Sequence, residues 1–398
     1  MLDGLDPAVS PPDDPAPRSR GPGWPEEGKD GMRWVAEPRK SAPGLDSLLV
    51  WAFRLGASRV SFSTGKRVRV RVHGRNRLAT REVLDDAEVA AIANHLYSAD
   101  GVARLQGGKD FDVAYEVAVS RTERLRFRLN ATATRTGRKF GANVVLRPIA
   151  DMPMSLDEQR VEPAIREAAR FKDGIALVGG ATGSGKSMLI GALTVDKLLD
   201  PEGDYDIVEA AAPVEFLLSR IQSPCSGIDQ SEIPRDHASF ADFIRGCWRR
   251  EPTDIIVGEC RDGETMAAAI HATIAGAALT TTLHVKNAPL TVRRALTLLP
   301  PGERDSLVDG LCQSLRLVVN QRLVPSTDGK RTALREFVVF DEALRRKMRR
   351  ADPGDWEDLV RGALDVRGQN YATAIRRALD AGLITEQTAR DELRREEQ

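Results

Sequence analysis

The segment from Gly180 to Ser187 constrains the fold of this chain more than any other feature. It reads Gly-Ala-Thr-Gly-Ser-Gly-Lys-Ser and matches the pattern G-x-x-x-x-G-K-[ST]. A short apolar strand pattern, Gly174 to Val178, precedes it, and a helical pattern follows from Met188. In this strand–loop–helix order the glycine-rich backbone exposes its N–H groups, and the helix directs its positive dipole end toward an anion. The sequence therefore predicts a site for a nucleoside triphosphate.

The predicted ligands are ATP and Mg²⁺. Lys186 is expected to reach the β- and γ-phosphates as a point charge, and the Ser187 hydroxyl is expected to coordinate the metal ion. A glycine-rich turn without a ligand is the alternative, which the flanking strand and helix patterns disfavour. The predicted nucleotide-binding residues are Gly180, Ala181, Thr182, Gly183, Ser184, Gly185, Lys186 and Ser187.

A second motif is an apolar strand that ends in an acid, Asp254 to Glu259. The run Asp-Ile-Ile-Val-Gly-Glu has the Walker B pattern, with Gly258 where many P-loop enzymes place a metal-binding Asp. Glu259 is then expected to polarise the attacking water, directly or as a ligand of the metal. A strand-end acid is common without any catalytic role, so the P-loop upstream is what favours this interpretation.

Further polar groups lie close to Glu259 in the sequence or at the end of another short strand. Arg261, Asp262 and Glu264 could form an ion network beside the acid. His284 ends the apolar strand pattern from Leu279 to Leu283, and we expect it to sense the γ-phosphate. A histidine with a purely structural role is the alternative.

Two pairs of arginines are candidates for contact with phosphate. Arg126 and Arg128 lie two apart on a predicted strand, so they share a face. Arg245 and Arg249 lie four apart on a helix predicted from Asp242 to Arg250, so they share a face as well. A planar, permanently charged guanidinium suits an arginine finger across an interface. Solvated or salt-bridged arginines are the alternative for all four.

The rhythm of the chain predicts an α/β protein with two domains. Its 398 residues are too many for one ordinary core, and 41% of them are hydrophobic. Several strand patterns with few helices indicate a small α+β domain, whereas strands and helices then alternate as in a doubly wound, mostly parallel sheet. The expected organisation is a disordered Pro/Gly-rich tail at 1–42, the α+β domain at 43–150, the P-loop domain at 151–340 and a charged helical extension at 341–398.

Composition excludes several classes of protein. The formal net charge is zero, so the whole chain has no nucleic-acid or membrane footprint. No apolar run approaches the roughly 18 residues of a spanning helix, and the N-terminus lacks the features of a secretory signal. The cysteines are scattered, which favours reduced thiols over disulfides or a zinc site. We expect a cytoplasmic protein. The four cysteines are Cys225, Cys247, Cys260 and Cys312.

Taken together, these segments resemble the secretion-superfamily ATPases (PilT/GspE-like), the motors of type II and type IV secretion and of twitching pili. The resemblance runs from about Leu45 through Glu336 and into the C-terminal tail. It rests on Arg126 to Asn130 as the "RFRxN" strand, Pro213 to Phe216 as the end of the Asp box, Val257 to Asp262 as "VGExRD", Thr282 to His284 as the end of the His box, and Asn320 to Leu323 as "xQRL". Within the superfamily, Gln230 to Arg235 and the short layout without a zinc loop are similar to the DotB/TraJ-like ATPases of type IVB secretion and conjugation.

The resemblance implies a PAS-like N-terminal domain, a RecA-like C-terminal domain and a homo-hexamer. It implies that nucleotide sits between the two domains, that Glu215 positions water or metal, and that arginines of the N-terminal domain complete the site. Partners would be inner-membrane secretion or pilus proteins at the cytoplasmic face, which would hold the chain peripherally at that membrane. Direct binding of nucleic acid is not expected.

Two positions depart from the family pattern. The Asp box usually has an acid two residues before its Pro, where this chain has Ala211, and Glu209 lies out of register. The His box usually begins with Gly-His, where this chain has Gly276-Ala277. Both changes touch groups that position water or metal, so nucleotide binding is expected to survive and the hydrolysis rate is the property they affect.

The leading hypothesis is a hexameric ATPase that powers type IVB secretion or conjugal transfer. A pilus-retraction ATPase of twitching motility is an alternative that the zinc-free layout equally allows. A second alternative is a nucleotide-gated assembly scaffold with slow turnover, which Ala211 and Ala277 permit. A DNA helicase is disfavoured, because no basic stripe with interleaved aromatic residues is evident.

Overall fold

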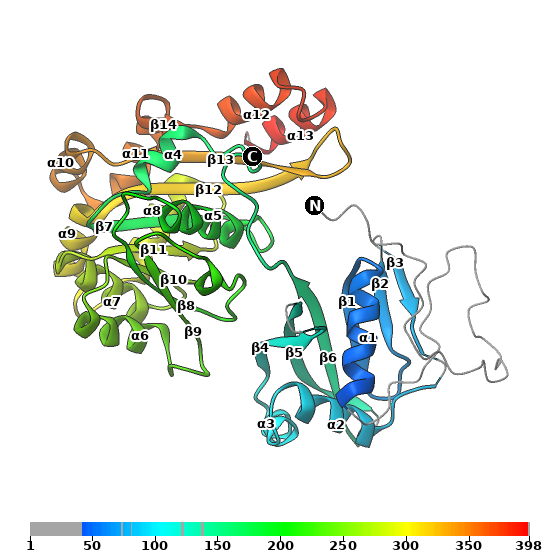
Figure 1. Cartoon of the computed structure of the whole chain (residues 1–398). Coiled ribbons are helices and arrows are strands. Elements are labelled where there is room, and N and C mark those ends of the chain that lie inside the picture. Colours follow the sequence, from blue (N-terminus) through cyan, green and yellow to red (C-terminus); the bar gives the residue numbers. More distant parts are fainter. Residues whose placement is uncertain (1–41, 73–74, 81, 121–122, 137–138, 397–398) are drawn as a thin grey trace. The chain divides into compact units, whose positions relative to one another are not determined.

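The computed structural model describes residues 42–72, 75–80, 82–120, 123–136 and 139–396, and it divides into two compact units between Asp151 and Met152 (Figure 1). Each unit has a sheet and a core of its own. The tail predicted at 1–42 lies outside the described residues, except for Ala42, which begins helix α1.

The first unit is one antiparallel sheet with helices packed against it. Its six strands run in the order β3-β2-β1-β6-β5-β4, and every described pairing between them is antiparallel. Alternate residues of the strands, such as Leu125, Phe127 and Leu129, enter a core that α1 and α2 also line. The elements are α1 (Ala42–Arg54), β1 (Ala57–Ser63), β2 (Arg69–Val72), β3 (Arg75–Leu78), α2 (Asp86–Leu96), α3 (Gly101–Gln106), β4 (Phe111–Ala118), β5 (Arg124–Thr136) and β6 (Lys139–Ile149).

The start of α2 follows directly from local chemistry. The Asp85 carboxylate accepts a hydrogen bond from the Glu88 backbone N–H at 2.7 Å, and the Glu88 carboxylate accepts one from the Asp85 N–H at 2.9 Å. This reciprocal capping box satisfies two N–H groups that a helix end leaves unpaired. The sequence predicts a helix start at these residues, and the prediction is confirmed.

The second unit contains an eight-stranded sheet in the order β14-β13-β12-β7-β11-β10-β8-β9. The six strands from β12 to β9 pair in parallel, and β13 and β14 extend the sheet in antiparallel fashion. The predicted mostly parallel sheet is therefore confirmed. The strands are β7 (Gly174–Gly179), β8 (Asp206–Ala211), β9 (Gly227–Glu232), β10 (Asp254–Val257), β11 (Ala278–Leu283), β12 (Leu315–Pro325), β13 (Arg331–Val339) and β14 (Gly368–Gln369).

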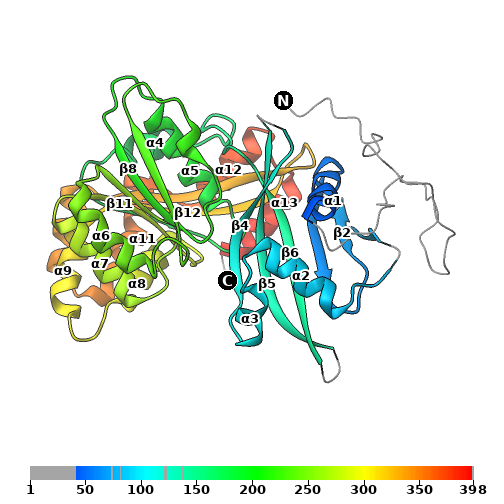
Figure 2. The ribbon, with the colours of Figure 1, turned by 60° about the horizontal axis from the view of Figure 1, so that its bottom comes forward.

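Helices cover both faces of this sheet (Figure 2). One core holds residues of α4 and α5, and the other holds residues of α6 to α11. Parallel strands buried on both faces are continuously apolar, as β7 is, whose six residues are all buried. The helices are α4 (Pro163–Ala168), α5 (Lys186–Leu198), α6 (Phe240–Cys247), α7 (Gly263–Ile274), α8 (Ala288–Leu298), α9 (Arg304–Ser314), α10 (Glu342–Arg350), α11 (Trp356–Arg367), α12 (Tyr371–Asp380) and α13 (Glu386–Glu396).

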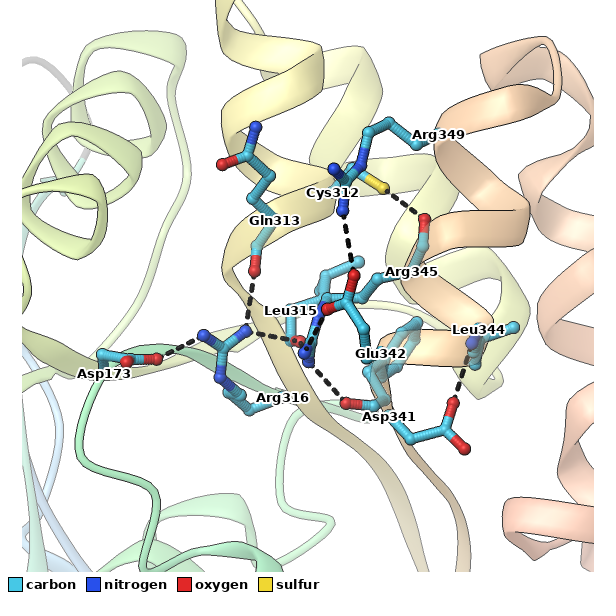
Figure 3. A network of polar contacts seen from close by, with 11 residues as sticks. Asp173, Cys312, Gln313, Leu315, Arg316, Asp341, Glu342, Leu344, Arg345 and Arg349 are labelled. Carbon is cyan, nitrogen blue, oxygen red and sulfur yellow. Dashed lines mark hydrogen bonds and ion pairs between the residues drawn. The ribbon is translucent and has the colours of Figure 1, made fainter.

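The helical segment predicted from residue 341 belongs to this unit. A polar network joins α10 to the start of β12 and the end of α9 (Figure 3). Arg345 donates to the Leu315 carbonyl at 3.2 Å and to Glu342 at 3.0 Å, and Arg316 pairs with Asp173 just before β7. Buried residues of α10 and α11 join the same core as the sheet, so these helices cannot be removed without opening it.

The structure also bears on the expectations about membrane-spanning helices and about the cysteines. None of the helices in the described ranges is long and apolar enough to cross a bilayer. The four cysteines carry free thiols, and burial raises the pKa of Cys247 and Cys312 to about 11 and that of Cys260 to about 12. Buried thiols with raised pKa values are poor nucleophiles and poor metal ligands.

Candidate functional site

The predicted phosphate-binding loop lies between β7 and α5. Its glycines adopt positive φ values, +147° at Gly180, +78° at Gly183 and +85° at Gly185. Gly185 occupies the N-cap of α5 and, within the described chain, no side chain caps that helix. The first-turn N–H groups of a helix have no intrahelical acceptor, so this end of α5 suits an anion.

The loop is closely packed, and it leaves one buried hydroxyl without a partner. A Cβ on Gly180 would lie 2.4 Å from Ser184 Oγ and 2.5 Å from the Gln321 carbonyl oxygen, so only glycine fits there. Ser184 Oγ is itself buried, and it has no hydrogen-bond partner among the described residues. A buried hydroxyl without a partner is costly, and a phosphate oxygen of a ligand would satisfy it.

Lys186 points back into the loop. Its Nζ donates to the carbonyl oxygens of Gly180 at 2.8 Å and Ala181 at 3.1 Å, and the residue is only 8% exposed. Burial lowers the pKa of Lys186, and the carboxylates of Glu259 and Glu215 oppose that shift. The structure thus brings the predicted lysine and the two predicted acids into one electrostatic site.

Glu259 follows β10 and is held from two sides. Its Oε1 lies 3.1 Å from His284 Nε2, and its Oε2 lies 2.6 Å from Arg261 Nη2. These partners meet because β10 and β11 are parallel neighbours whose carboxyl ends reach the same edge of the sheet. Thr282 fixes the turn by donating to the Gly258 carbonyl at 2.7 Å. The carboxylate is therefore oriented before any ligand arrives.

The ion network predicted beside Glu259 is wrong in part. Arg261 does pair with Glu259, but Asp262 caps α7 by accepting from the Thr265 N–H at 2.8 Å. Glu264 pairs instead with Arg245 of α6 at 2.7 Å. Asp262 therefore starts a helix, because its short carboxylate reaches the backbone of the next turn better than a neighbouring guanidinium.

The helix predicted from Asp242 to Arg250 is also corrected. The α-helix ends at Cys247, and a 3₁₀ turn, Trp248–Arg250, follows it. Glu251 then adopts a left-handed conformation with φ of 49°, immediately before Pro252, which ends the helical path. The segment that carries Arg245 and Arg249 therefore stays helical through the 3₁₀ turn, and exposed Arg245 is already paired with Asp242 at 2.9 Å.

Arg126 and Arg128 lie on β5 of the first unit. Leu125, Phe127 and Leu129 point into the core, so the two arginines share the opposite face of the strand. Arg126 is buried, at 4% exposed. Arg128 makes a two-pronged contact with Asp112, at 3.1 Å from Nε and 2.9 Å from Nη2.

Ala211, one of the two departures from the family pattern, ends β8 beside Gly258. A Cβ on Gly258 would lie 3.1 Å from the Ala211 Cα, so a side chain at 258 would crowd the end of β8. Glu209 shares the strand face of Ala211 and accepts a hydrogen bond from Gln230 at 2.5 Å. Burial, reinforced by nearby Glu215, raises the pKa of Glu209 to about 7. An acid is thus present on this face, one pleat before the usual position.

The raised pKa of Glu209 predicts a pH-dependent stability. Its folded-state pKa of about 7 lies above the ordinary value of 4.5, so its contribution is fully present below pH 4.5 and is lost as the pH rises through 7. Glu209→Gln should therefore gain up to about 3 kcal/mol on wild type between pH 4.5 and pH 8. Urea unfolding at both pH values measures this. The same change at exposed Glu167 on α4 is the control, and an equal pH response of Glu209→Gln and wild type would refute the prediction.

These residues fit a magnesium site in which phosphate oxygens of the nucleotide complete the coordination. Among the described residues, no group of three or more His, Cys, Asp and Glu side chains could hold a metal ion alone. Mg²⁺ is commonly held by one or two protein oxygens together with phosphate oxygens and water. Ser187, in the first turn of α5, and Glu259, which follows β10, carry oxygen donors of the kind that Mg²⁺ prefers.

The sequence alone did not assign a role to the polar residues of β12 and β13 that hydrogen-bond to the phosphate-binding loop or to each other. Gln321 on β12 donates from Nε2 to the Ser184 carbonyl at 2.7 Å, and Arg335 on β13 donates from Nε to Gln321 Oε1 at 2.7 Å. Both are buried, at 2% and 1% exposed. The available signal was the pair of amide side chains Asn320 and Gln321, which follow the apolar run Leu317 to Val319 and begin the segment that resembles "xQRL".

Comparisons with known proteins agree with this geometry. Residues 45–350 match the family described as "Type II/IV secretion system protein". The chain is 26% identical over 347 residues to the "Type IV pilus retractation ATPase PilT" of Pseudomonas aeruginosa, which covers 87% of this chain and 97% of that protein. The fold superposes on the X-ray structure of the Legionella pneumophila ATPase DotB with a TM-score of 0.84 and 32% identity, over 91% of this chain and 98% of that one. It superposes on the crystal structure of the pilus retraction motor PilT with bound ADP with a TM-score of 0.74 and 25% identity, over 87% and 95%.

Proposed function

Because this chain belongs to the type II/IV secretion system protein family and is an ATPase with the RecA-like fold of that family, we propose that it forms a homo-hexamer that powers type IVB secretion or conjugal transfer. The observation that carries the proposal is a P-loop with a buried Lys186 and a strand-end Glu259 that His284 and Arg261 hold in place. The similarity to DotB over nearly the whole chain favours this machine. Its place would be the cytoplasmic face of the inner membrane, held there by partner proteins of the machine.

In the proposed reaction the loop binds the phosphates of ATP and Glu259 activates water. The N–H groups of Gly183, Gly185 and the first turn of α5 point to the phosphates, and Lys186 leaves its carbonyl partners to neutralise them. Mg²⁺, held by Ser187 and Glu259 with the phosphates, would supply charge neutralisation. Glu259 accepts a proton from water, while His284 and Arg261 keep its carboxylate aimed. Glu209, on the strand face of Ala211, and Glu215, which acts electrostatically on Glu209, would replace the acid that is missing at Ala211.

We also propose that four arginines assist the reaction by stabilising charge on the γ-phosphate. Arg126 and Arg128 are the first pair, because they share one strand face and one of them is buried. Arg245 would have to give up its ion pairs with Asp242 and Glu264 to take part, whereas exposed Arg249 forms no ion pair within the described part of the chain. A ring would bring such groups to a site from a neighbouring copy.

Replacing Arg128 with Ala should lower turnover without unfolding the chain. The Arg128–Asp112 pair is half exposed, so its loss costs at most about 1 kcal/mol of stability. An arginine that stabilises the transition state contributes far more, so we expect kcat to fall at least about tenfold. Asp112→Ala breaks the same pair but keeps the arginine, and it should retain turnover. Equal losses in the two variants, or unchanged kinetics in both Arg126→Ala and Arg128→Ala, would remove the role in catalysis.

The proposed machine is tested in the organism that carries this chain. Deletion should abolish substrate transfer through the secretion or conjugation apparatus, and wild-type chain but not Lys186→Ala should restore it. Pilus retraction is the second candidate, because the chain aligns with PilT over 97% of that protein. Loss of twitching with intact transfer would favour that candidate and overturn the first. Light scattering with a non-hydrolysed ATP analogue tests the hexamer, which requires six times the monomer mass.

A further inference from the structure

A buried polar chain begins directly beneath the phosphate-binding loop. Gln321 touches the loop at both ends: a Cβ on Gly185 would lie 2.7 Å from its Nε2, and a Cβ on Gly180 would lie 2.5 Å from its carbonyl oxygen. The Gln321 Nε2 donates to the Ser184 carbonyl at 2.7 Å. One glutamine on β12 therefore supports the loop, 137 residues away in sequence.

Arg335 fixes the orientation of that glutamine. Its Nε donates to Gln321 Oε1 at 2.7 Å, so the amide cannot turn over without losing both hydrogen bonds. The guanidinium is held in turn by the carbonyls of Arg160 at 3.2 Å and Gln159 at 3.1 Å, and by Glu162 at 3.4 Å. A rigid, planar donor with several fixed acceptors has little freedom to rotate, so Arg335 locks the Gln321 amide.

The direction of the Ser184 carbonyl decides where a neighbouring N–H group points. The C=O and N–H groups of a trans peptide point to opposite sides of its plane. Because Gln321 holds the Ser184 carbonyl toward β12, the Gly185 N–H is directed away from β12, to the side where α5 begins. Backbone N–H groups aimed in this way form the cradle that binds phosphate oxygens.

We propose that Gln321 is a positioning residue for nucleotide phosphates, acting through the Ser184–Gly185 peptide, and that Arg335 keeps its amide in the active orientation. A purely structural amide would stabilise the fold and leave nucleotide affinity alone. The contacts favour a role in nucleotide binding, because the Gln321 Nε2 donates to the Ser184 carbonyl of the loop and the Gln321 Oε1 accepts from buried Arg335. These hydrogen bonds join only groups of the chain itself, so they can organise the phosphate-binding loop before the nucleotide binds.

The test uses Gln321→Glu in the full chain. The carboxylate keeps the size and the acceptor for Arg335, so the fold is retained, but it cannot donate to the Ser184 carbonyl. Affinity for a fluorescent ATP analogue with Mg²⁺ should fall about tenfold or more, and KM should rise while kcat changes less than about threefold. Unfolding temperature without nucleotide should stay near that of wild type. An affinity and KM within twofold of wild type would overturn the inference.

A second variant and a control complete the design. Gln321→Met removes both hydrogen bonds and should lose affinity to at least the same degree as Gln321→Glu. Gln369→Met removes a buried amide of the same network, which donates to the Arg335 carbonyl at 2.9 Å and to Glu162 at 3.1 Å without touching the loop. It should lower the unfolding temperature and leave affinity unchanged. The inference rests on the proposed nucleotide site: a wild type that binds no ATP overturns that function, whereas full binding by the Gln321 variants overturns only the positioning role.

Discussion

Replacing Glu259 with Gln is expected to slow ATP hydrolysis by about 100-fold or more, because a positioned general base contributes that much to proton transfer. The amide keeps the size of the carboxylate and can still accept a hydrogen bond from His284 or Arg261. It cannot accept a proton from water, and it is a weaker metal ligand. ATP affinity should stay within a few-fold of wild type, because the loop and Lys186 are unchanged. Phosphate release under single-turnover conditions measures the chemical step directly.

The matched control for this variant is Glu167→Gln. Glu167 is exposed on α4, so the same chemical change falls outside the site. It should leave kcat near the wild-type value. If wild type and Glu259→Gln release phosphate equally slowly while both bind ATP tightly, the chain would be a nucleotide-gated scaffold and the motor would be excluded.

The slow-turnover alternative depends on the neighbours of Glu259. Gly258 lies close to Ala211, and a Cβ at 258 would lie 3.1 Å from the Ala211 Cα. With alanine at 211, Glu209 and Glu215 are the carboxylates that could replace the usual acid. Glu209 has a pKa near 7 and is partly protonated at neutral pH. Turnover should therefore depend more on Glu259 here than it would with three ionised acids around the site.

The site could be predicted from sequence where its residues are neighbours in the chain. The P-loop lies between a wholly apolar strand and a helix, and Glu259 follows four buried residues of β10, so short windows contain the whole signal. The capping box at Asp85 is another local signal that the structure reproduces. Patterns of this kind need no knowledge of the rest of the fold.

Other features depend on partners that no short window contains. Strand β1 gives little local signal because buried serines interrupt its apolar pattern, and Ser63 has its hydrogen-bond partner, Asn143, eighty residues away. The helix predicted to reach Arg250 stops at Cys247 because Glu251 turns left-handed before Pro252. Gln321 could be assigned to a family-like segment from the sequence, but its role depends on Ser184 and Arg335, which lie 137 and 14 residues away.

Replacing Lys186 with Ala is expected to abolish tight ATP binding. A buried ammonium that pairs with a ligand anion contributes about 2–5 kcal/mol when one partner is removed, which corresponds to at least about a 30-fold loss of affinity. Exposed Lys172, which precedes β7, provides a matched Lys→Ala control that should bind ATP as wild type does. Equilibrium binding of a fluorescent ATP analogue measures both, and wild-type affinity in Lys186→Ala would contradict the proposed nucleotide site.

The same variant separates binding from stability, because without nucleotide the fold gains little from this ammonium group. Burial lowers the pKa of Lys186, so the charged form is disfavoured in the folded chain, and its hydrogen bonds to Gly180 and Ala181 offset only part of that cost. Lys186→Ala should therefore unfold near the wild-type temperature when no nucleotide is present. Wild type should gain about 2.7 kcal/mol of stability at a ligand concentration 100 times its Kd, whereas the variant, with an affinity at least about 30-fold lower, should gain at most about 0.9 kcal/mol at that concentration. A variant that unfolds early without ligand yet keeps the full ligand-induced gain would show that Lys186 supports the loop and does not bind phosphate.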